Sequence, residues 1–172
     1  ADGWWASGSN AQITATAGSS WNFSGWTGQT NGCTISSNTI TAPMTYPRAI
    51  TANFTTVQYS LTVTSPSYGK PSPAAGTNWI NQGSELTAMV TNSPAVMGST
   101  QYVCTGWTGT GSAPASGTTT NTGPFTLATN STVAWRWSTN YWLDTSTSGS
   151  GTVNVADGWW ASGSNAQITA TA

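Results

Sequence analysis

A segment of 17 residues occurs twice in this chain without a single change. It reads ADGWWASGSNAQITATA and spans residues 1–17 and residues 156–172, so the two copies are 155 residues apart. Identity over this length indicates an internal repeat, and a repeat of fixed period is the signature of tandem architectures. We therefore expect a tandem array with a 155-residue period, of which this sequence is a window slightly longer than one period.

Each period contains two related halves. Both halves contain the tetrapeptide GWTG, at residues 25–28 and 106–109. Both also open on a tyrosine followed by alternating residues, which read YSLTV at 59–63 and YWLDT at 141–145. These matches predict that one architecture is built twice in every period.

An alignment of the halves, which also matches ELTA at 85–88 with QITA at 167–170, predicts the repeat units. Residues 59–140 are expected to form a complete β repeat unit. Residues 1–58 are expected to be the C-terminal portion of a unit that lacks its first strand. Residues 141–172 are expected to be the N-terminal portion of the next unit. On this prediction the duplicated segment is an interior piece of a unit and not a terminal tag.

Short runs of alternating apolar and polar residues occur throughout the chain, bounded by Gly, Pro, Asn and Ser. This period of two is typical of strands with one buried face, and no stretch shows the 3.6-residue period of a helix. The sequence predicts an all-β fold of small β-sandwich, Ig-like or β-grasp-like repeat units, two per 155-residue period. Aromatic side chains bury large areas. The predicted structural core comprises Trp21, Phe23, Trp26, Tyr102, Trp107, Trp135 and Trp137.

The duplicated segment carries two adjacent tryptophans, Trp4 and Trp5 in the first copy and Trp159 and Trp160 in the second. Adjacent residues of a strand face opposite sides, so at least one Trp of each pair is expected to point away from its own core. Such a ring can pack against a neighbouring unit or stack on a sugar. We expect packing between units, because large exposed apolar surface usually marks an interface.

These patterns resemble a known family of repeats. The shared pattern consists of Y-x-L-x-V, a glycine turn, L-T-A, x-F-x-G-W-T-G and a closing T-A-x-F, and it is similar to the divergent internalin-B-type (InlB B) repeat. The best match reads FSGWTG at 23–28 and ITANF at 50–54. The other half departs at Cys104, in place of the aromatic residue, and at Trp137, in place of the closing Phe. The resemblance implies a repetitive, non-enzymatic module of bacterial secreted and cell-surface proteins, and it carries over no catalytic residue.

The chain is poor in charge, with three Lys and Arg, four Asp and Glu and no His. Binding to nucleic acid needs clustered Lys and Arg, so that partner is excluded. No stretch approaches the roughly 18 apolar residues of a membrane-spanning helix, so membrane insertion is not expected. Without histidine, imidazole-based proton transfer and metal sites are not expected either. The sequence therefore predicts no enzyme, no catalytic residue, no metal site and no cofactor.

Two pairs of residues leave chemical alternatives open. Cys33 and Cys104 are even in number and could form a disulfide between adjacent halves or chains, as exported proteins permit. The alternative is two free thiols, with Cys104 acting as a small buried apolar residue. Lys70 and Glu85 raise the idea of an amide crosslink from a buried Lys, against which stands a solvated lysine in the turn at Gly69.

We expect a structural function, as a tandem-repeat extracellular protein that forms a bacterial surface stalk, fibre or filament. Its partners would be copies of itself, in neighbouring repeats or in neighbouring chains. The runner-up is an adhesin or carbohydrate-binding repeat whose exposed Trp residues contact surface glycans. Because a nearly neutral surface favours association, either sugars on the many Ser and Thr residues keep the protein soluble, which would make it a glycoprotein, or association is its purpose.

Overall fold

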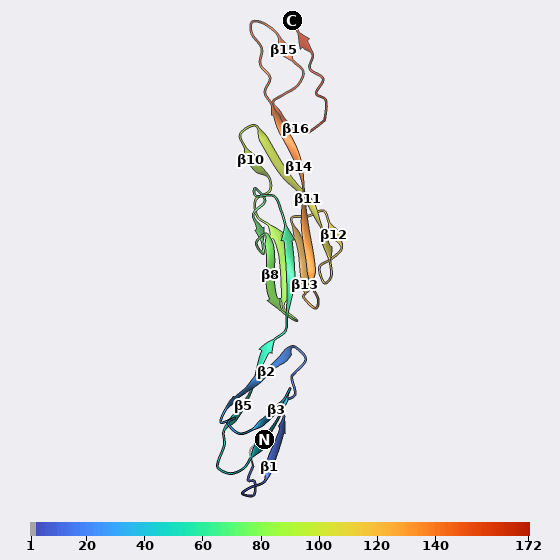
Figure 1. Cartoon of the computed structure of the whole chain (residues 1–172). Helices are drawn as coiled ribbons and strands as arrows, with labels where there is room; N and C mark the ends of the chain where they lie inside the picture. Colours follow the sequence, from blue (N-terminus) through green and yellow to red (C-terminus); the bar gives the residue numbers. More distant parts are fainter. Residues whose placement is uncertain (1–2) are drawn as a thin grey trace. The chain divides into compact units, whose positions relative to one another are not determined.

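The structure is a computed structural model that describes residues 3–172. These residues form strands and no helix, which confirms the all-β prediction. The chain divides into two compact units, residues 1–58 and residues 59–172 (Figure 1). Strand β14 (Ser131–Leu143) runs through residue 140 without interruption. The boundary predicted between residues 140 and 141 therefore falls inside a strand, and the separate unit at 141–172 stays a prediction.

The first unit contains two small antiparallel sheets. One has the order β1-β4-β3, and the other pairs β2 with β5. The strands are β1 (Asn10–Thr14), β2 (Trp21–Gly28), β3 (Thr34–Ser36), β4 (Thr39–Pro43) and β5 (Ile50–Thr56). The buried apolar residues described in this unit are one large side chain, Ile40, and three alanines, Ala11, Ala15 and Ala42. This interior is thus filled mostly by small residues.

The second unit is built around a larger sheet. Its strand order is β10-β11-β14-β6-β8, with β12 paired to β11 and β16 paired to β14, beside a sheet β13-β9-β7 and the pair β15-β17. Besides β14, the strands are β6 (Gln58–Thr64), β7 (Pro71–Ser72), β8 (Gly76–Asn81), β9 (Glu85–Val90), β10 (Ala95–Met97), β11 (Thr100–Thr110), β12 (Ser116–Gly117), β13 (Asn121–Thr126), β15 (Thr152–Val153), β16 (Gly158–Ala161) and β17 (Ala170–Thr171). Among residues 3–172, no helix is long and apolar enough to cross a membrane.

The two GWTG motifs occupy the same position in the two units. In the first unit, β2 pairs with β5, and a register shift lies between Phe23 and Gly25. In the second unit, β11 pairs with β14, and the shift lies between Cys104 and Gly106. Both glycines have positive φ, 142° and 126°. Glycine populates such φ values readily, and it often marks a β-bulge inside a strand, which explains why the first Gly of GWTG recurs.

The apolar core of the second unit includes β6 at its centre. This strand runs parallel to β14, with Leu61 opposite Ser131 and Val63 opposite Val133. Leu61 and Val133 are fully buried, and Val63 is 2% exposed. All three belong to one buried cluster with Trp107. The first strand of the repeat therefore supplies the inner apolar residues around which the other strands pack.

The alignment of QITA with ELTA between the halves is wrong by two residues. The N–H of Gly8 donates to Met44 O at 3.0 Å, just as the N–H of Gly83 donates to Leu127 O at 2.8 Å. Gly8 and Gly83 therefore occupy equivalent positions, and β1 and β9 align two residues away from the match read in the sequence. A shift of two residues keeps every side chain on the same face of the strand, so the assignment of inward positions is unaffected.

Candidate functional site

The main candidate site is an open pocket inside the first unit. Its volume is about 470 Å³, and it is lined by the chain around Gly3, by strands β1 and β4, and by the start of β5. The lining residues that matter below are Gly3, Trp5, Ile13, Met44 and residues 48–51. Most of these side chains are apolar. The pocket thus has a mixed lining of apolar side chains and polar atoms.

Among the described lining residues one side chain is charged, Arg48, and it is engaged within its own unit. Its Nη1 donates to Gln29 O at 3.0 Å and to Asn31 O at 2.7 Å, and its Nε donates to Pro43 O at 3.0 Å. Its guanidinium also lies 4.2 Å from the centre of the Tyr46 ring, within the range of a cation–π contact. These partners hold the charge in place, so the pocket offers apolar surface and not a free cation.

The pocket also borders an open strand edge. Strand β5 pairs with β2 on one side and has no second partner in the part of the unit that is described. Ala49 N–H donates to Gln29 Oε1, and Gln29 N–H donates to Ala49 O, both at 2.7 Å. Backbone groups alternate in direction along a strand, so those of Ile50 are directed toward the open edge. Such an edge is a template for pairing with another strand.

The first tryptophan pair differs in exposure. Trp4 is 104% exposed, whereas Trp5 is 50% exposed and lines the pocket. Their counterparts in the second unit behave alike, since Trp79 is 65% exposed while Ile80 packs against the buried core. The outer position of the pair is therefore exposed in both units, and the inner position faces the interior.

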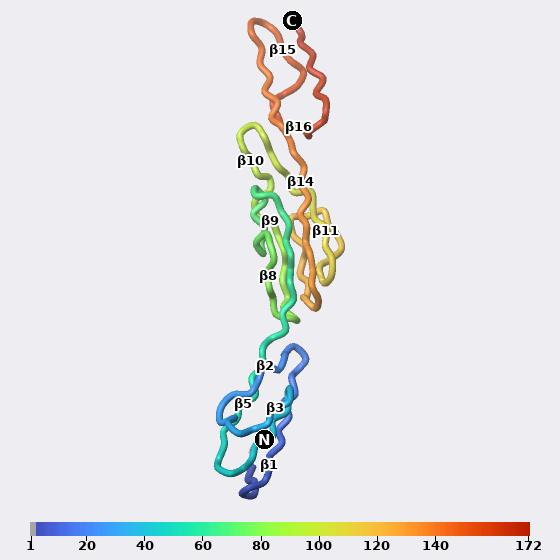
Figure 2. Tube along the Cα trace, in the orientation of Figure 1, coloured from blue at the N-terminus to red at the C-terminus, as the bar shows by residue number. Residues whose placement is uncertain are grey.

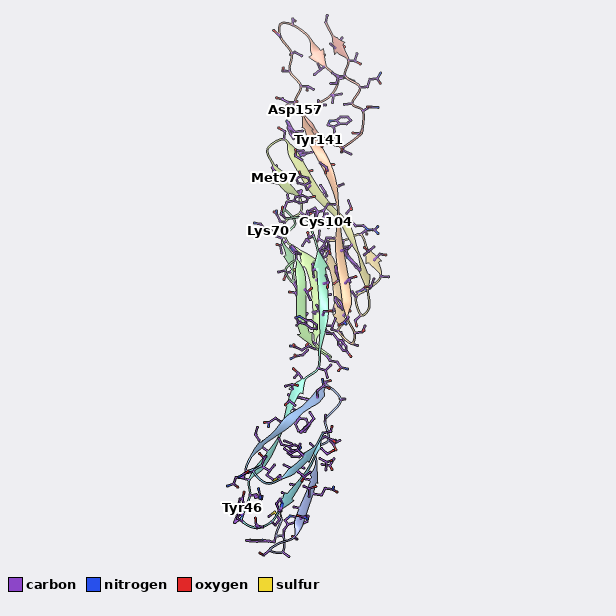
Figure 3. All side chains as sticks on the ribbon, in the orientation of Figure 1. Tyr46, Lys70, Met97, Cys104, Tyr141 and Asp157 are labelled. Carbon is purple, nitrogen blue, oxygen red and sulfur yellow. The ribbon has the colours of Figure 1, made fainter. Side chains whose placement is uncertain are left out.

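The second copy of the tryptophan pair has a partner strand. Trp159 and Trp160 lie in β16, half-buried, opposite Trp142 and Tyr141 of β14. The rings of Trp142 and Trp159 meet edge to face at 5.2 Å between centres. Figures 2 and 3 show this part of the chain beyond the body of the second unit, with Tyr141 labelled in Figure 3. The duplicated Trp-Trp sequence is thus paired with a strand in its second copy and more exposed in its first copy.

The structure places the seven predicted core aromatics at different depths. Trp107 and Trp135 are buried. Four more are partly buried: Phe23, Trp26, Tyr102 and Trp137. Trp21 is 48% exposed and is not a core residue. The reason is its place at the start of β2, opposite Thr56 at the end of a two-stranded sheet.

Both cysteines are free thiols in the single chain, and a disulfide between neighbouring chains stays a prediction. Each thiol is engaged in its own unit. Cys33 Sγ accepts a hydrogen bond from Arg48 Nη1 at 3.4 Å. Cys104 lies in the buried core, where desolvation raises the pKa of its thiol. Cys104 therefore acts as the small buried residue that the sequence offered as the alternative.

The amide crosslink is not supported either. Lys70 and Glu85 are both exposed, and Lys70 lies in a turn with a φ of 41° (Figure 3). The crosslink idea needs a buried lysine, and the side chain of Lys70 is exposed. Residues 3–172 also contain no group of three or more Cys, Asp or Glu side chains that could hold a metal ion.

Two groups of side-chain contacts were not predicted from the sequence. Tyr68 stacks on Tyr102 at 3.8 Å between ring centres and meets Trp137 edge to face at 5.3 Å. Asp157 accepts hydrogen bonds from the N–H and the hydroxyl of Thr145, which lower the pKa of its carboxyl. Neither contact follows a sequence period.

Comparison with known proteins supports the resemblance for one unit. Residues 1–58 match the family described as the divergent InlB B-repeat domain. No curated protein and no solved structure matches the chain. The matched segment coincides with the first compact unit. The half at 59–140, which departs from the pattern at Cys104 and Trp137, lies outside the match. The first unit of this chain is therefore an InlB B-repeat-like domain.

Proposed function

We propose that the chain is a structural repeat protein of the bacterial surface, whose modules form a stalk, fibre or filament outside the cell. The observation that carries the proposal is the InlB B-repeat-like domain of residues 1–58, a type of bacterial surface repeat module. The second unit supports it, because it builds its β11–β14 pair around the same GWTG bulge. Modules that share one core and repeat along a chain suit a quasi-one-dimensional structural role.

The composition supports the same role. Charged residues make up 4% of the sequence, and the apolar residues left exposed include several tryptophans. A surface of low charge with exposed aromatic rings favours contact with other protein surfaces over solvation. The partners that we propose are therefore other copies of these modules, and the location that we propose is extracellular.

One observation favours a second candidate, a carbohydrate-binding repeat. Trp4 and Tyr46 border a groove of about 420 Å³ that Arg48 and Met44 also line. Aromatic rings beside polar groups are the usual composition of a small-molecule site. A sugar could stack on Trp4 there. The structural role has the wider support, because the GWTG bulge is common to both units.

Two measurements test the proposal. Gold-labelled antibodies against the chain should decorate extended surface structures of the native cells in electron micrographs. Labelling confined to the cell interior would refute it. The purified chain should bind no glycan on an array, or any binding should be unchanged in the Trp4→Ala variant. The matched control is Trp79→Ala. Binding that is lost in Trp4→Ala alone would favour the carbohydrate-binding candidate instead.

A further inference from the structure

A hairpin formed by β10 and the start of β11 lies beside the C-terminal end of β14 (Figure 1). We call it the β10 hairpin and define it as residues 95–102. Its two-residue turn is Gly98-Ser99, and Gly98 has a φ of 61°, a positive value that the first position of such a turn commonly needs. Ser99 O accepts a hydrogen bond of 2.9 Å from Trp142 N–H. The tip of the β10 hairpin is thus bonded to the backbone of β14.

The other edge of β14 carries β16 at the same place. Strand β16 pairs with residues 140–143. Its ladder continues with a hydrogen bond of 2.8 Å from Ser162 N–H to Thr139 O. The C-terminal end of β14 is therefore the middle strand between the β10 hairpin and β16.

The end of β14 and β16 repeat the arrangement of β6 and β8. After β8, Ser84 N–H donates to Asn81 O at 3.1 Å. After β16, Ser164 N–H donates to Ala161 O at 3.0 Å, so the same turn follows both strands. Strand β6 pairs with β8 as the end of β14 pairs with β16. The end of β14 therefore corresponds to β6, the opening strand of a repeat, as the match of YWLDT with YSLTV also indicates.

The first unit joins the equivalent strands without such a hairpin. Its β1 and β2 are connected by residues 15–20, which form no strand. Its ladder ends with a hydrogen bond of 2.9 Å from Val57 N–H to Ser20 O. In the second unit, β9 and β11 are connected by residues 91–99, which contain β10, and the hydrogen bonds continue to Trp142. The β10 hairpin is thus an addition to the common repeat, placed where the next opening strand begins.

We propose that the β10 hairpin is a brace, which couples the repeat of residues 59–140 to the opening strand that follows it. The hairpin is bonded to β14 beyond residue 140, and β14 holds β16 through its other edge. Only one of the two halves contains the hairpin, so one junction in each period of the array is braced. This inference goes beyond the proposed function, because it concerns coupling along one chain, whatever that chain builds.

The coupling follows from the position of the two bonded amides. The N–H groups of Trp142 and Ser162 are bonded at opposite edges of β14. Strand ends open locally at a lower free energy than a core does, and both bonds are lost when the end of β14 opens. The β10 hairpin raises the free energy of that opening. Its effect should therefore extend to Ser162, although Ser162 lies at the opposite edge.

The test replaces residues 91–101 by TAGSS, the sequence of residues 16–20 that makes the shorter connection in the first unit. Amide hydrogen exchange of the full chain, resolved by NMR, reports opening at single residues. We expect exchange at Trp142 and Ser162 to accelerate by about tenfold, because the hydrogen bonds of the hairpin are lost. The internal reference is the N–H of Gly109, which is bonded within the repeat of residues 59–140 and should exchange at an unchanged rate.

A point variant replaces this test if circular dichroism shows that the shortened chain is not folded. Gly98→Ala puts a side chain at positive φ in the turn of the β10 hairpin, where nothing lies within 4 Å of the added Cβ. The matched control is Gly83→Ala, in the turn before β9, which has a φ of 83° and equally open surroundings. Gly98→Ala alone should accelerate exchange at Trp142 and Ser162, by about fivefold.

Acceleration at Trp142 without acceleration at Ser162 would overturn the brace, because the hairpin would then hold only its own contact. Equal acceleration at Gly109 would overturn it too, since the hairpin would then support its own repeat and not the junction. These results do not depend on what the native cells display. A surface fibre without this coupling would leave the structural role standing, whereas coupling without any surface structure would leave the brace standing and refute the proposed role.

Discussion

The GWTG bulge can be tested with a single methyl group at Gly106. This residue has a φ of 126° at the register shift of β11. A Cβ placed there would collide with Gly117 O and would lie 2.8 Å from Thr118 Cα, both backbone atoms of the β12 region. The matched control is Gly123 in the same unit, which has a φ of 69° and nothing within 4 Å of an added Cβ. Gly123 lies in the left-handed region, so the comparison measures the collision together with the more extreme φ of Gly106.

The expected effects follow from these contacts. A non-glycine residue in a left-handed conformation costs about 1–2 kcal/mol, and the loss of chain entropy in the unfolded state returns about 0.4–1 kcal/mol. Gly123→Ala should therefore destabilise the unit by about 1 kcal/mol. Gly106→Ala must also displace β12, which pairs at Trp107 and Thr108. With about 1 kcal/mol for each of two backbone hydrogen bonds, its total should be about 3 kcal/mol.

Hydrogen exchange read by mass spectrometry measures this difference in the second unit alone. Where amides of β11 and β14 exchange through unfolding of the unit, Gly106→Ala should accelerate them by roughly 150-fold and Gly123→Ala by about fivefold, at 1.4 kcal/mol per factor of ten. Equal acceleration in the two variants would show that Gly106 is needed only for its φ. No acceleration in either variant would refute the whole account of the bulge.

Three further outcomes follow from the structure. Trp107→Ala empties a buried site and should destabilise the second unit by about 3–5 kcal/mol in urea unfolding, and a change below about 1 kcal/mol would contradict its core position. Iodoacetamide should modify Cys33 before Cys104 in the folded chain, because burial raises the pKa of the Cys104 thiol. Mass spectrometry of timed samples measures the order, and modification of Cys104 first would contradict the prediction. The hydrogen bonds from Thr145 lower the pKa of the Asp157 carboxyl. This contact therefore stabilises the folded loop above the ordinary carboxyl pKa of 3.8 and is lost as the pH falls below that value. An NMR shift of the Thr145 amide that stays constant through this acid range would contradict the contact.

Much of the architecture could be predicted because it follows from local periodicity. Alternation with a period of two identified the strands, and the paired GWTG motifs identified equivalent positions in the two halves. The alignment of the halves was wrong by two residues at β1 and β9, because short Thr-Ala strands match in more than one register. The hydrogen bonds of Gly8 and Gly83 identify the correct register. Trp21 was assigned to the core because a tryptophan side chain is usually buried. Its position at a strand end leaves it uncovered.

The pocket could not be predicted, since it depends on which neighbours a strand has in space. ITANF reads as a buried strand. That pattern does not show that Arg48 and Ile50 would border an open space instead of collapsing onto β1. The contact between Asp157 and Thr145 was likewise missed, because it joins two loop residues whose spacing follows no strand or helix period.

The central claim is that these repeat modules assemble into an extracellular fibre. A cryo-electron microscopy map of the native assembled material tests it most directly, at a resolution that separates strands. The account predicts modules with the GWTG bulge repeated along an extended fibre, with Trp5 covered by protein. Isolated chains without axial order, or a sugar bound beside Trp5, would contradict it.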